Sequence, residues 1–203
     1  MDEPQHKLAV DSYYYNDWCY TVGIIFDDWQ QSEPIETISC YTRTYKQYNP
    51  GNFHWRELPG IIKLLKQVDL THIDTIIVDA NVFIYRNNTV SDGLGKHLYD
   101  AIYKRREDIK IIGICKSLCG DNEAYVKVFR GHSKKPLYIT SYNIDTTQCA
   151  EYVKNMKGAH RIPKLLKMLD NETKKFKDNP LDTKDICPVL KKRKHSSSYN
   201  KMH

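Results

Sequence analysis

Two short and almost continuous apolar runs, "IDTIIVDA" (73–80) and "IKIIGICKS" (109–117), constrain the fold of this chain most. Short runs rich in isoleucine and valine are typical of strands that are buried on both faces of a sheet. A segment with helical spacing, "GKHLYDAIYKRR" (95–106), lies between them. A strand, a helix and a second strand in this order predict a parallel βαβ unit with helices packed on the sheet.

The segments around this unit predict the rest of an α/β domain. Three β-branched and aromatic runs, 8–15, 19–26 and 35–45, are separated by polar segments and indicate an antiparallel three-stranded meander. Helices are expected at 59–68, 146–157 and 163–177, and further strands at 124–129 and 136–140. Pro59 is expected in the first turn of its helix. The predicted fold class is therefore α/β, with a mixed sheet flanked by helices.

The length of 203 residues suits one domain, which we place at 1–177, followed by a loosely ordered basic tail at 178–203. The formal net charge is +6, but the residues from Val189 onward hold five basic and no acidic residues, which leaves about +1 for the remainder. Charge alone does not make the folded part a nucleic-acid binder. The six cysteines lack zinc-site spacing and are expected to be reduced.

Hydropathy excludes two classes of protein. No run approaches the roughly 18 to 20 apolar residues that a membrane span needs, and the opening "MDEPQHK" is too polar for a secretory signal. We therefore expect a monomeric protein of the cytoplasm without a membrane partner. The segment "KKRKHSSS" in the tail leaves a nuclear location open, although lysine-rich ends are commonly just solvated.

Two aspartates stand beside predicted core segments, Asp11 within the first strand and Asp79 at the end of "TIIVD". An ionised carboxylate beside a core costs several kcal/mol unless it is compensated, and two on adjacent strands repel each other. A divalent cation resolves both problems, because Mg²⁺ takes carboxylate oxygens and keeps other positions for water and phosphate. The alternative is structural: Asp79 caps a loop and Asp11 pairs with a lysine.

Three more charged residues are candidates for the same site. Glu57 precedes the predicted helix at 59–68 and can reach this end of the sheet, although the dipeptide "RE" is also a common surface ion pair. Asp170 lies on the last predicted helix, and its facing is open. Lys116 ends the second parallel strand, where open α/β sheets bind ligands, although a lone lysine there is more often solvated.

The ordered set of motifs resembles the endonuclease V family over residues 8 to 172. The matching segments are "AVDSYY", "YNPGNFHWRELP", "IIVDA", "GLGKHL", "IIGICKS", "KPLYITSYN" and "HRIPKLLKMLD". The resemblance implies a ribonuclease-H-like fold and cleavage of a phosphodiester bond near a deaminated purine, hypoxanthine, in DNA or RNA. It also implies Mg²⁺ as the cofactor, with Mn²⁺ as a substitute.

Roles carried over from the family follow the matching positions. Asp11, Glu57 and Asp79 look like the metal-binding carboxylates, and Asp170 matches a further acidic position near the metal. Lys116 is similar to an active-site lysine that steadies the phosphate or the attacking water. The wedge that fills the gap left by the displaced base is expected at Tyr48, Pro50 and Gly51.

The chain departs from the family where the base pocket is expected. Ala80, Val82 and Tyr85 stand where the family has glycine, glycine and histidine, and their side chains would reshape the pocket. The hypothesis is therefore a Mg²⁺-dependent endonuclease that leaves 3′-hydroxyl and 5′-phosphate ends. Two alternatives stay open: a non-catalytic nucleic-acid-binding relative, and another ribonuclease-H-like nuclease that recognises strand structure instead of a modified base.

Overall fold

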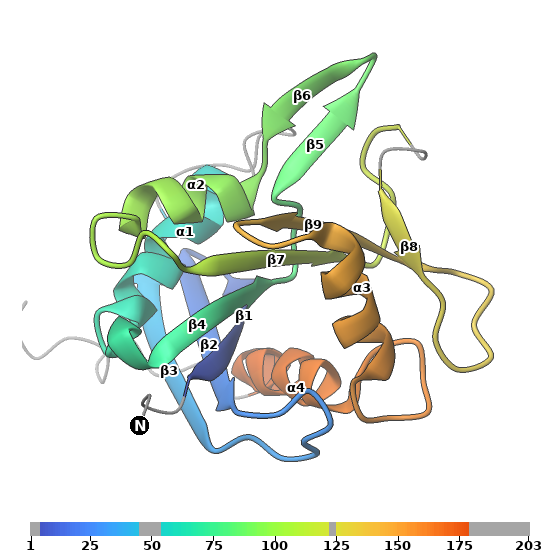
Figure 1. Ribbon diagram of the computed structural model, residues 1–203. Helices are drawn as coiled ribbons and strands as arrows, with labels where there is room; N and C mark the ends of the chain where they lie inside the picture. The colour runs from blue at the N-terminus through green and yellow to red at the C-terminus, as the bar shows by residue number, and fades with distance from the viewer. Residues whose placement is uncertain (1–4, 45–53, 122–124, 179–203) are drawn as a thin grey trace, which may run out of the picture.

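A computed structural model describes residues 5–44, 54–121 and 125–178 of the chain. Figure 1 shows a central sheet with helices on both of its faces. The sheet has seven strands in the order β3-β2-β1-β4-β7-β9-β8. The strands are β1 (His6–Tyr15), β2 (Trp18–Phe26), β3 (Glu36–Arg43), β4 (Ile73–Val78), β7 (Lys110–Cys115), β8 (Val126–Val128) and β9 (Leu137–Tyr142). The helices are α1 (His54–Leu65), α2 (Leu94–Ile102), α3 (Thr146–Asn155) and α4 (Lys164–Asp178), with a short 3-10 helix at Leu70–His72.

The pairing of the strands confirms the predicted mixed sheet. Strands β1, β2 and β3 form the antiparallel meander, while β4 and β7 form the parallel pair joined through α2. Strand β1 also runs parallel to β4, with Val10 opposite Val78. The meander and the parallel unit therefore meet at β1 and β4, in the middle of the sheet.

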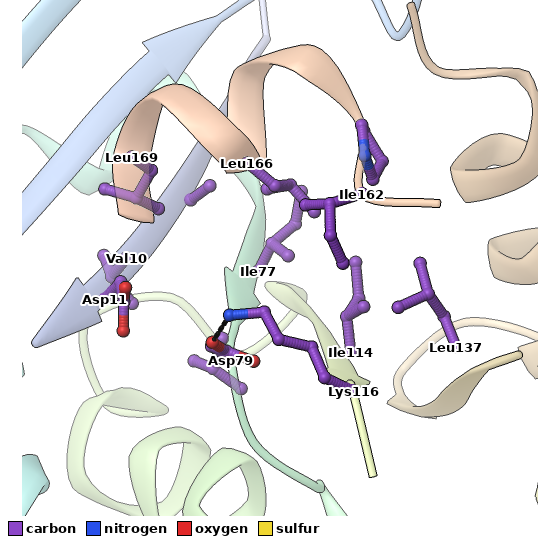
Figure 2. A pocket seen from close by; sticks show the side chains of 13 residues that line it. Val10, Asp11, Ile77, Asp79, Ile114, Lys116, Leu137, Ile162, Leu166 and Leu169 are labelled. Carbon is purple, nitrogen blue, oxygen red and sulfur yellow. Dashed lines mark hydrogen bonds and ion pairs between the residues drawn. The ribbon is translucent and has the colours of Figure 1, made fainter. Parts of the chain in front are cut away.

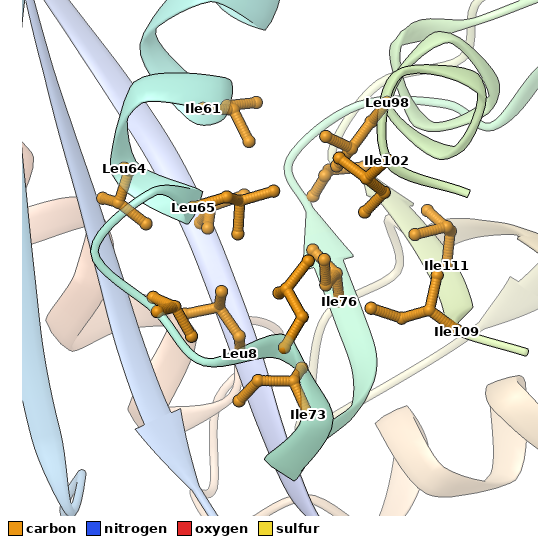
Figure 3. Packing of buried hydrophobic residues seen from close by; sticks show 14 of the residues in the cluster. Leu8, Ile61, Leu64, Leu65, Ile73, Ile76, Leu98, Ile102, Ile109 and Ile111 are labelled. Atoms are coloured by element: carbon orange, nitrogen blue, oxygen red, sulfur yellow. The ribbon is translucent and has the colours of Figure 1, made fainter. Parts of the chain in front are cut away.

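The two faces of the sheet bury separate hydrophobic clusters, because side chains alternate along each strand. On one face, Ile76 of β4 and Ile111 of β7 pack under α1 and α2, as Figure 3 shows. On the other face, Ile77 and Ile112 from the same strands pack against α3 and α4. Burial on both faces explains why these two strands read as continuous apolar runs.

Two local predictions differ from the structure. Helix α1 begins at His54, so Pro59 lies inside the helix and not in its first turn. A hairpin of β5 (Phe83–Arg86) and β6 (Thr89–Asp92) was not predicted, and Figure 1 shows it projecting away from the central sheet. Asn87 and Asn88 turn this hairpin with φ values of 50° and 60°. Asparagine tolerates this left-handed conformation better than most residues, which makes the two-residue turn possible.

The predicted thiols are free where the structure describes them. Cys19, Cys40 and Cys149 are buried, whereas Cys115 and Cys119 are half-buried. Across residues 5–44, 54–121 and 125–178, the structure contains no helix with the length and apolar character that crossing a membrane requires. The predicted tail lies outside the described residues from 179 onward, so the domain boundary stays a prediction.

Candidate nuclease site

A pocket of about 340 Å³ opens where β1 and β4 end beside α1 and α4. Four carboxylates from four different elements line it: Asp11, Glu57, Asp79 and Asp170. The other lining residues are Ser12, Tyr13, Tyr14, Arg56, Thr173 and Lys174. The sheet and two helices thus bring together acids that are up to 159 positions apart in the sequence.

The parallel register of β1 and β4 brings the two aspartates together. Val10 pairs with Val78, so Asp11 and Asp79 are the next residues along the two neighbouring strands. One Asp11 oxygen accepts a hydrogen bond from the Ser12 backbone N–H at 2.8 Å, and the other lies 3.4 Å from the Thr173 hydroxyl, which is 3.0 Å from the Asp170 carbonyl oxygen. The Asp11 carboxylate is therefore oriented by its own strand and by α4.

Glu57 reaches the pocket from the first turn of α1, not from a loop before the helix as predicted. Its side chain is buried, with the residue only 8% exposed. The guanidinium of the neighbouring Arg56 lies over the ring of Tyr14, 3.8 Å from the ring centroid. This cation–π contact fixes the start of α1 against β1 and so directs Glu57 inward.

The turn that carries Asp79 is held by contacts with β7 and β9. The Thr140 hydroxyl accepts the backbone N–H of Val82 at 2.8 Å, and the Cys115 thiol donates to the Asn81 side chain at 2.9 Å. Gly113 of β7 packs against this turn, and an added Cβ there would come within 2.4 Å of the Ala80 carbonyl oxygen. A side chain at position 113 would push this turn, and Asp79 with it, out of place.

Replacing Thr140 with valine is expected to destabilise the protein by about 1–3 kcal/mol. The change preserves shape but leaves the Val82 N–H buried without an acceptor, which costs the desolvation of that group. Thermal unfolding of Thr140→Val and of Thr140→Ser measures the effect, since serine retains the hydroxyl. An equal loss of stability in both variants would assign the effect to the methyl group and contradict this account.

Lys116 connects two of the four acids. Its ammonium lies 2.5 Å from an oxygen of Asp79 and 3.6 Å from an oxygen of Asp170. Burial alone would lower the pKa of Lys116, but the charge and hydrogen bond of Asp79 raise it overall. Lys116 is therefore a fixed positive charge at the end of β7. Its position fits the predicted role near a phosphate.

The stem of Lys116 crosses a small apolar pocket on the α4 side of the sheet. Figure 2 shows Ile77, Ile114, Leu137 and Leu166 around it, with the ammonium extended to Asp79. The Lys116 side chain is 40% exposed, and the apolar neighbours on its other side limit where its charged end can go. The pocket therefore holds the lysine on the acid cluster.

Asp170 faces the pocket, which settles the facing that the sequence left open. It lies on α4, and its side chain is 15% exposed. One of its oxygens accepts hydrogen bonds from Lys167 at 2.9 Å and Lys174 at 2.8 Å. Burial would raise the pKa of Asp170, but the hydrogen bonds from Lys174 and Lys167 lower it to about 2. This carboxylate therefore stays ionised.

Asp11 and Glu57 have the opposite electrostatics. Burial, and then the charge of Asp79, raise the pKa of Asp11 to about 6. Burial, followed by the charges of Asp11 and Asp79, raises the pKa of Glu57 well above its usual range, and Arg56 offsets only part of this. The three acids repel one another, and a bound cation would relieve that repulsion. The chemistry of this donor set fits a hard divalent ion.

The side chains do not form a ready-made ligand group. Among the described residues, no group of three or more histidine, cysteine, aspartate or glutamate side chains is arranged to hold a metal ion. The positions of the lysines explain this: Lys116 is bonded to Asp79, and Lys167 and Lys174 are bonded to Asp170. An ion would have to displace Lys116 from Asp79.

The remaining predicted positions are those of the wedge and of the base contact. The expected wedge at Tyr48, Pro50 and Gly51 falls outside the described residues. Ala80, expected near the base, is 8% exposed and packs in the core under α1 and α2.

Sequence reasoning missed three residues that contact the acids: Lys167, Thr173 and Lys174. The spacing of the two lysines was a usable signal, because positions three before and four after Asp170 share its side of a helix. Thr173, three positions after Asp170, shares that side as well, but only the packing of α4 on β1 brings it to Asp11.

Comparison by sequence finds relatives at moderate identity. No family model matches the chain. A curated endonuclease V of Clostridium acetobutylicum is 26% identical over 171 residues, which cover 75% of this chain and 71% of the relative. A second curated endonuclease V, of Bacillus thuringiensis subsp. konkukian, is 26% identical over 198 residues, covering 87% of this chain and 83% of the relative.

Comparison by structure finds the same family. The catalytic domain of human endonuclease V matches with a TM-score of 0.66 at 16% identity, covering 89% of this chain and 86% of that one. Endonuclease V of Ciona intestinalis, in complex with a 23mer DNA containing an inosine followed by a ribo-adenosine, matches with a TM-score of 0.68 at 14% identity and 88% coverage of both chains. These structures establish the ribonuclease-H-like fold. The curated sequence relatives and these structures agree, so the chain is similar to endonuclease V in both sequence and fold.

Proposed function

We propose that this protein is a divalent-metal-dependent endonuclease that cleaves a phosphodiester bond of DNA or RNA near inosine, leaving 3′-hydroxyl and 5′-phosphate ends. The observation that carries the proposal is the convergence of Asp11, Glu57, Asp79 and Asp170 on one pocket, with Lys116 between two of them. Similarity to endonuclease V supports it, since the Ciona intestinalis endonuclease V was solved with inosine-containing DNA.

Asp11, Glu57 and Asp79 are the residues that would hold the ion, with Asp170 beside them. Carboxylate oxygens are the ligands that Mg²⁺ prefers, and Mn²⁺ accepts the same set. When bound, the ion would activate the attacking water and stabilise the leaving oxygen. No covalent nucleophile is required for this chemistry.

The protein groups around the acids have roles that follow from their contacts. The Ser12 N–H and the Thr173 hydroxyl orient Asp11, and the Arg56–Tyr14 stack holds Glu57 in the pocket. Lys116, once released from Asp79, would have its ammonium free for a phosphate oxygen of the strand.

One assay tests the proposal. Purified protein and its Asp79→Asn variant are incubated with inosine-containing and unmodified DNA and RNA strands, with Mg²⁺ or with a chelator. We expect metal-dependent cutting at inosine-containing strands and a loss of at least about 10²–10³-fold in the variant, the scale of losing one transition-state stabiliser. Asp100→Asn, an exposed acid of α2 paired with Lys96, is the matched control.

Two other results would favour the alternatives. Tight binding of inosine strands without any cutting would indicate a non-catalytic binding relative. Cutting that ignores inosine and follows strand structure would indicate a different ribonuclease-H-like nuclease. The first alternative is disfavoured because a binding module has no use for three mutually repelling acids, which destabilise the fold.

A further inference from the structure

More lysines lie around Asp170 than are needed to balance the charge of one carboxylate. Three ammonium groups surround it: Lys174 at 2.8 Å, Lys167 at 2.9 Å and Lys116 at 3.6 Å. Lys116 also serves Asp79, but the hydrogen bonds to acids from Lys167 and Lys174 both go to the same Asp170 oxygen. One cation would keep a half-buried carboxylate ionised, so the second α4 lysine is in excess.

Helical geometry separates these two lysines from Lys164 and Lys175, while Lys177 lies on the side of Asp170 but two turns further along α4. Lys167 and Lys174 lie about 60° and about 40° around the helix axis from Asp170. Lys164 and Lys175 lie about 120° and about 140° away. They have acids of their own: Lys164 pairs with Glu33 at 2.6 Å and Lys175 with Glu172 at 2.5 Å. The unmatched positive charge of α4 is therefore on the side that faces the acid pocket.

The two lysines are placed where they can change partners. Each side chain is 53% exposed, while the Asp170 side chain between them is 15% exposed. Lys174 also lines the pocket itself. Because both ammonium groups are largely exposed to water, each can leave Asp170 for another acceptor at little cost. A phosphate that approaches the pocket can therefore attract them.

We infer that Lys167 and Lys174 form a contact site for the phosphate backbone of a nucleic-acid strand, beside the acid pocket and separate from the bond to be cut. In the free protein they rest on Asp170. With a strand bound, their ammonium groups turn to phosphate oxygens on either side of Asp170. The inference rests on the proposed function for the identity of the strand, but the contact itself requires only a polyanionic backbone.

The simpler explanation is that both lysines serve only to keep Asp170 charged. The two explanations differ once Asp170 is removed. If the lysines contact phosphates, their effect on strand binding persists in an Asp170→Asn background. If they serve only Asp170, that effect disappears there.

The test measures binding, without cleavage, of the full-length chain to a fluorescein-labelled single strand of about 20 nucleotides. Anisotropy titrations are run in chelator at several salt concentrations, for strands with and without inosine. We expect Lys167→Met and Lys174→Met each to weaken binding about 3- to 10-fold near 0.1 M salt, equally for both strands. The slope of log affinity against log salt should fall by about 0.7 for each lysine, as loss of one phosphate contact requires. The same reductions should appear in the Asp170→Asn background.

Lys164→Met and Lys175→Met are the matched controls, because they remove the same charge from other sides of α4. We expect the slope to be unchanged in both. Slopes unchanged in the Lys167 and Lys174 variants would overturn the inference. So would reductions that vanish with Asp170→Asn, or equal reductions in the controls, which would reflect total charge. Melting curves confirm that the exposed substitutions leave the fold intact.

The outcomes also separate this inference from the proposed function. If the wild type cuts no strand but the salt-dependence slope falls in the two lysine variants, the backbone contact is supported and the proposed nuclease function is contradicted. If the wild type cuts inosine-containing strands but the slope is unchanged in the two lysine variants, the nuclease function is supported and the backbone contact is contradicted.

Discussion

Asp11→Asn is expected to make this protein more stable at pH 8 in chelator while it abolishes cleavage. The Asp11 carboxylate is ionised at that pH against both burial and the charge of Asp79. Asparagine keeps the shape and an oxygen for the Ser12 N–H, and it removes the charge. The same substitution also lowers the repulsion on Glu57.

The sign and size follow from the pKa of Asp11. A carboxyl whose pKa is raised on folding contributes stability below its unfolded value, and that stability is lost as the pH rises through the folded value. For Asp11 this window runs from 3.8 to about 6. At pH 8 the shift corresponds to about 3 kcal/mol at most, or roughly 5–10 °C in melting temperature for a chain of this size.

Thermal melts at pH 5 and pH 8, in chelator and with Mg²⁺, measure this effect. The wild type should lose stability between the two pH values in chelator and recover it with Mg²⁺, because an ion that binds only the folded state stabilises it. In Asp11→Asn, both the loss of stability between pH 5 and pH 8 and its recovery with Mg²⁺ should be smaller than in the wild type. Asp100→Asn, the exposed control, should stay within about 0.5 kcal/mol of the wild type. A variant less stable than the wild type at pH 8 in chelator would mean that the Asp11 charge is already compensated.

The fold was predictable where residues alternate or run continuously apolar. The meander and the pair β4 and β7 were predicted because a strand buried on one face alternates apolar and polar residues, and a strand buried on both faces is continuously apolar. The β5–β6 hairpin left a weaker trace, since its residues are mostly exposed and its turn uses Asn87 and Asn88 where the usual signal is Asn-Gly. The start of α1 was misjudged because Pro59 reads as a first-turn residue.

The acids of the site were predictable as candidates, but their surroundings were not. The register of β1 and β4 places Asp11 beside Asp79, whereas the sequence indicated only that both carboxylates stand beside core segments. The stack of Arg56 on Tyr14 depends on how α1 approaches β1, and that approach is set by tertiary packing. The same is true of the contact from Thr173 to Asp11.

Arg130→Met is expected to lower the free energy of unfolding by about 3–5 kcal/mol, the largest loss of stability that we expect for a single substitution here. Arg130 follows β8 and is 6% exposed. Its guanidinium donates to five backbone carbonyls at the end of α3 and in the segment that leads to α4: those of Lys154, Met156, Gly158, His160 and Arg161. Methionine fills much of the space but leaves these oxygens without their donor.

Arg130 also supports Lys116, through one intermediate residue. Arg161, in the segment held by Arg130, donates through a single nitrogen to the carbonyls of Lys116 and Pro136. The end of β7 is therefore fixed by a segment that Arg130 itself fixes. Loosening this segment should also free the start of α4, which carries Asp170 into the pocket.

Arg130→Lys separates the charge from the geometry. A lysine keeps the positive charge but has three donors from one atom, so it cannot span the same set of carbonyls. We therefore expect it to recover only part of the lost stability. Hydrogen exchange should rise in residues 154–163 in both variants, more in Arg130→Met, before it rises in β4 and β7. Full recovery by lysine would show that charge, and not the planar five-donor fork, holds the segment. Uniform exchange across the sheet would show that Arg130 supports the whole fold and not the segment that positions Lys116.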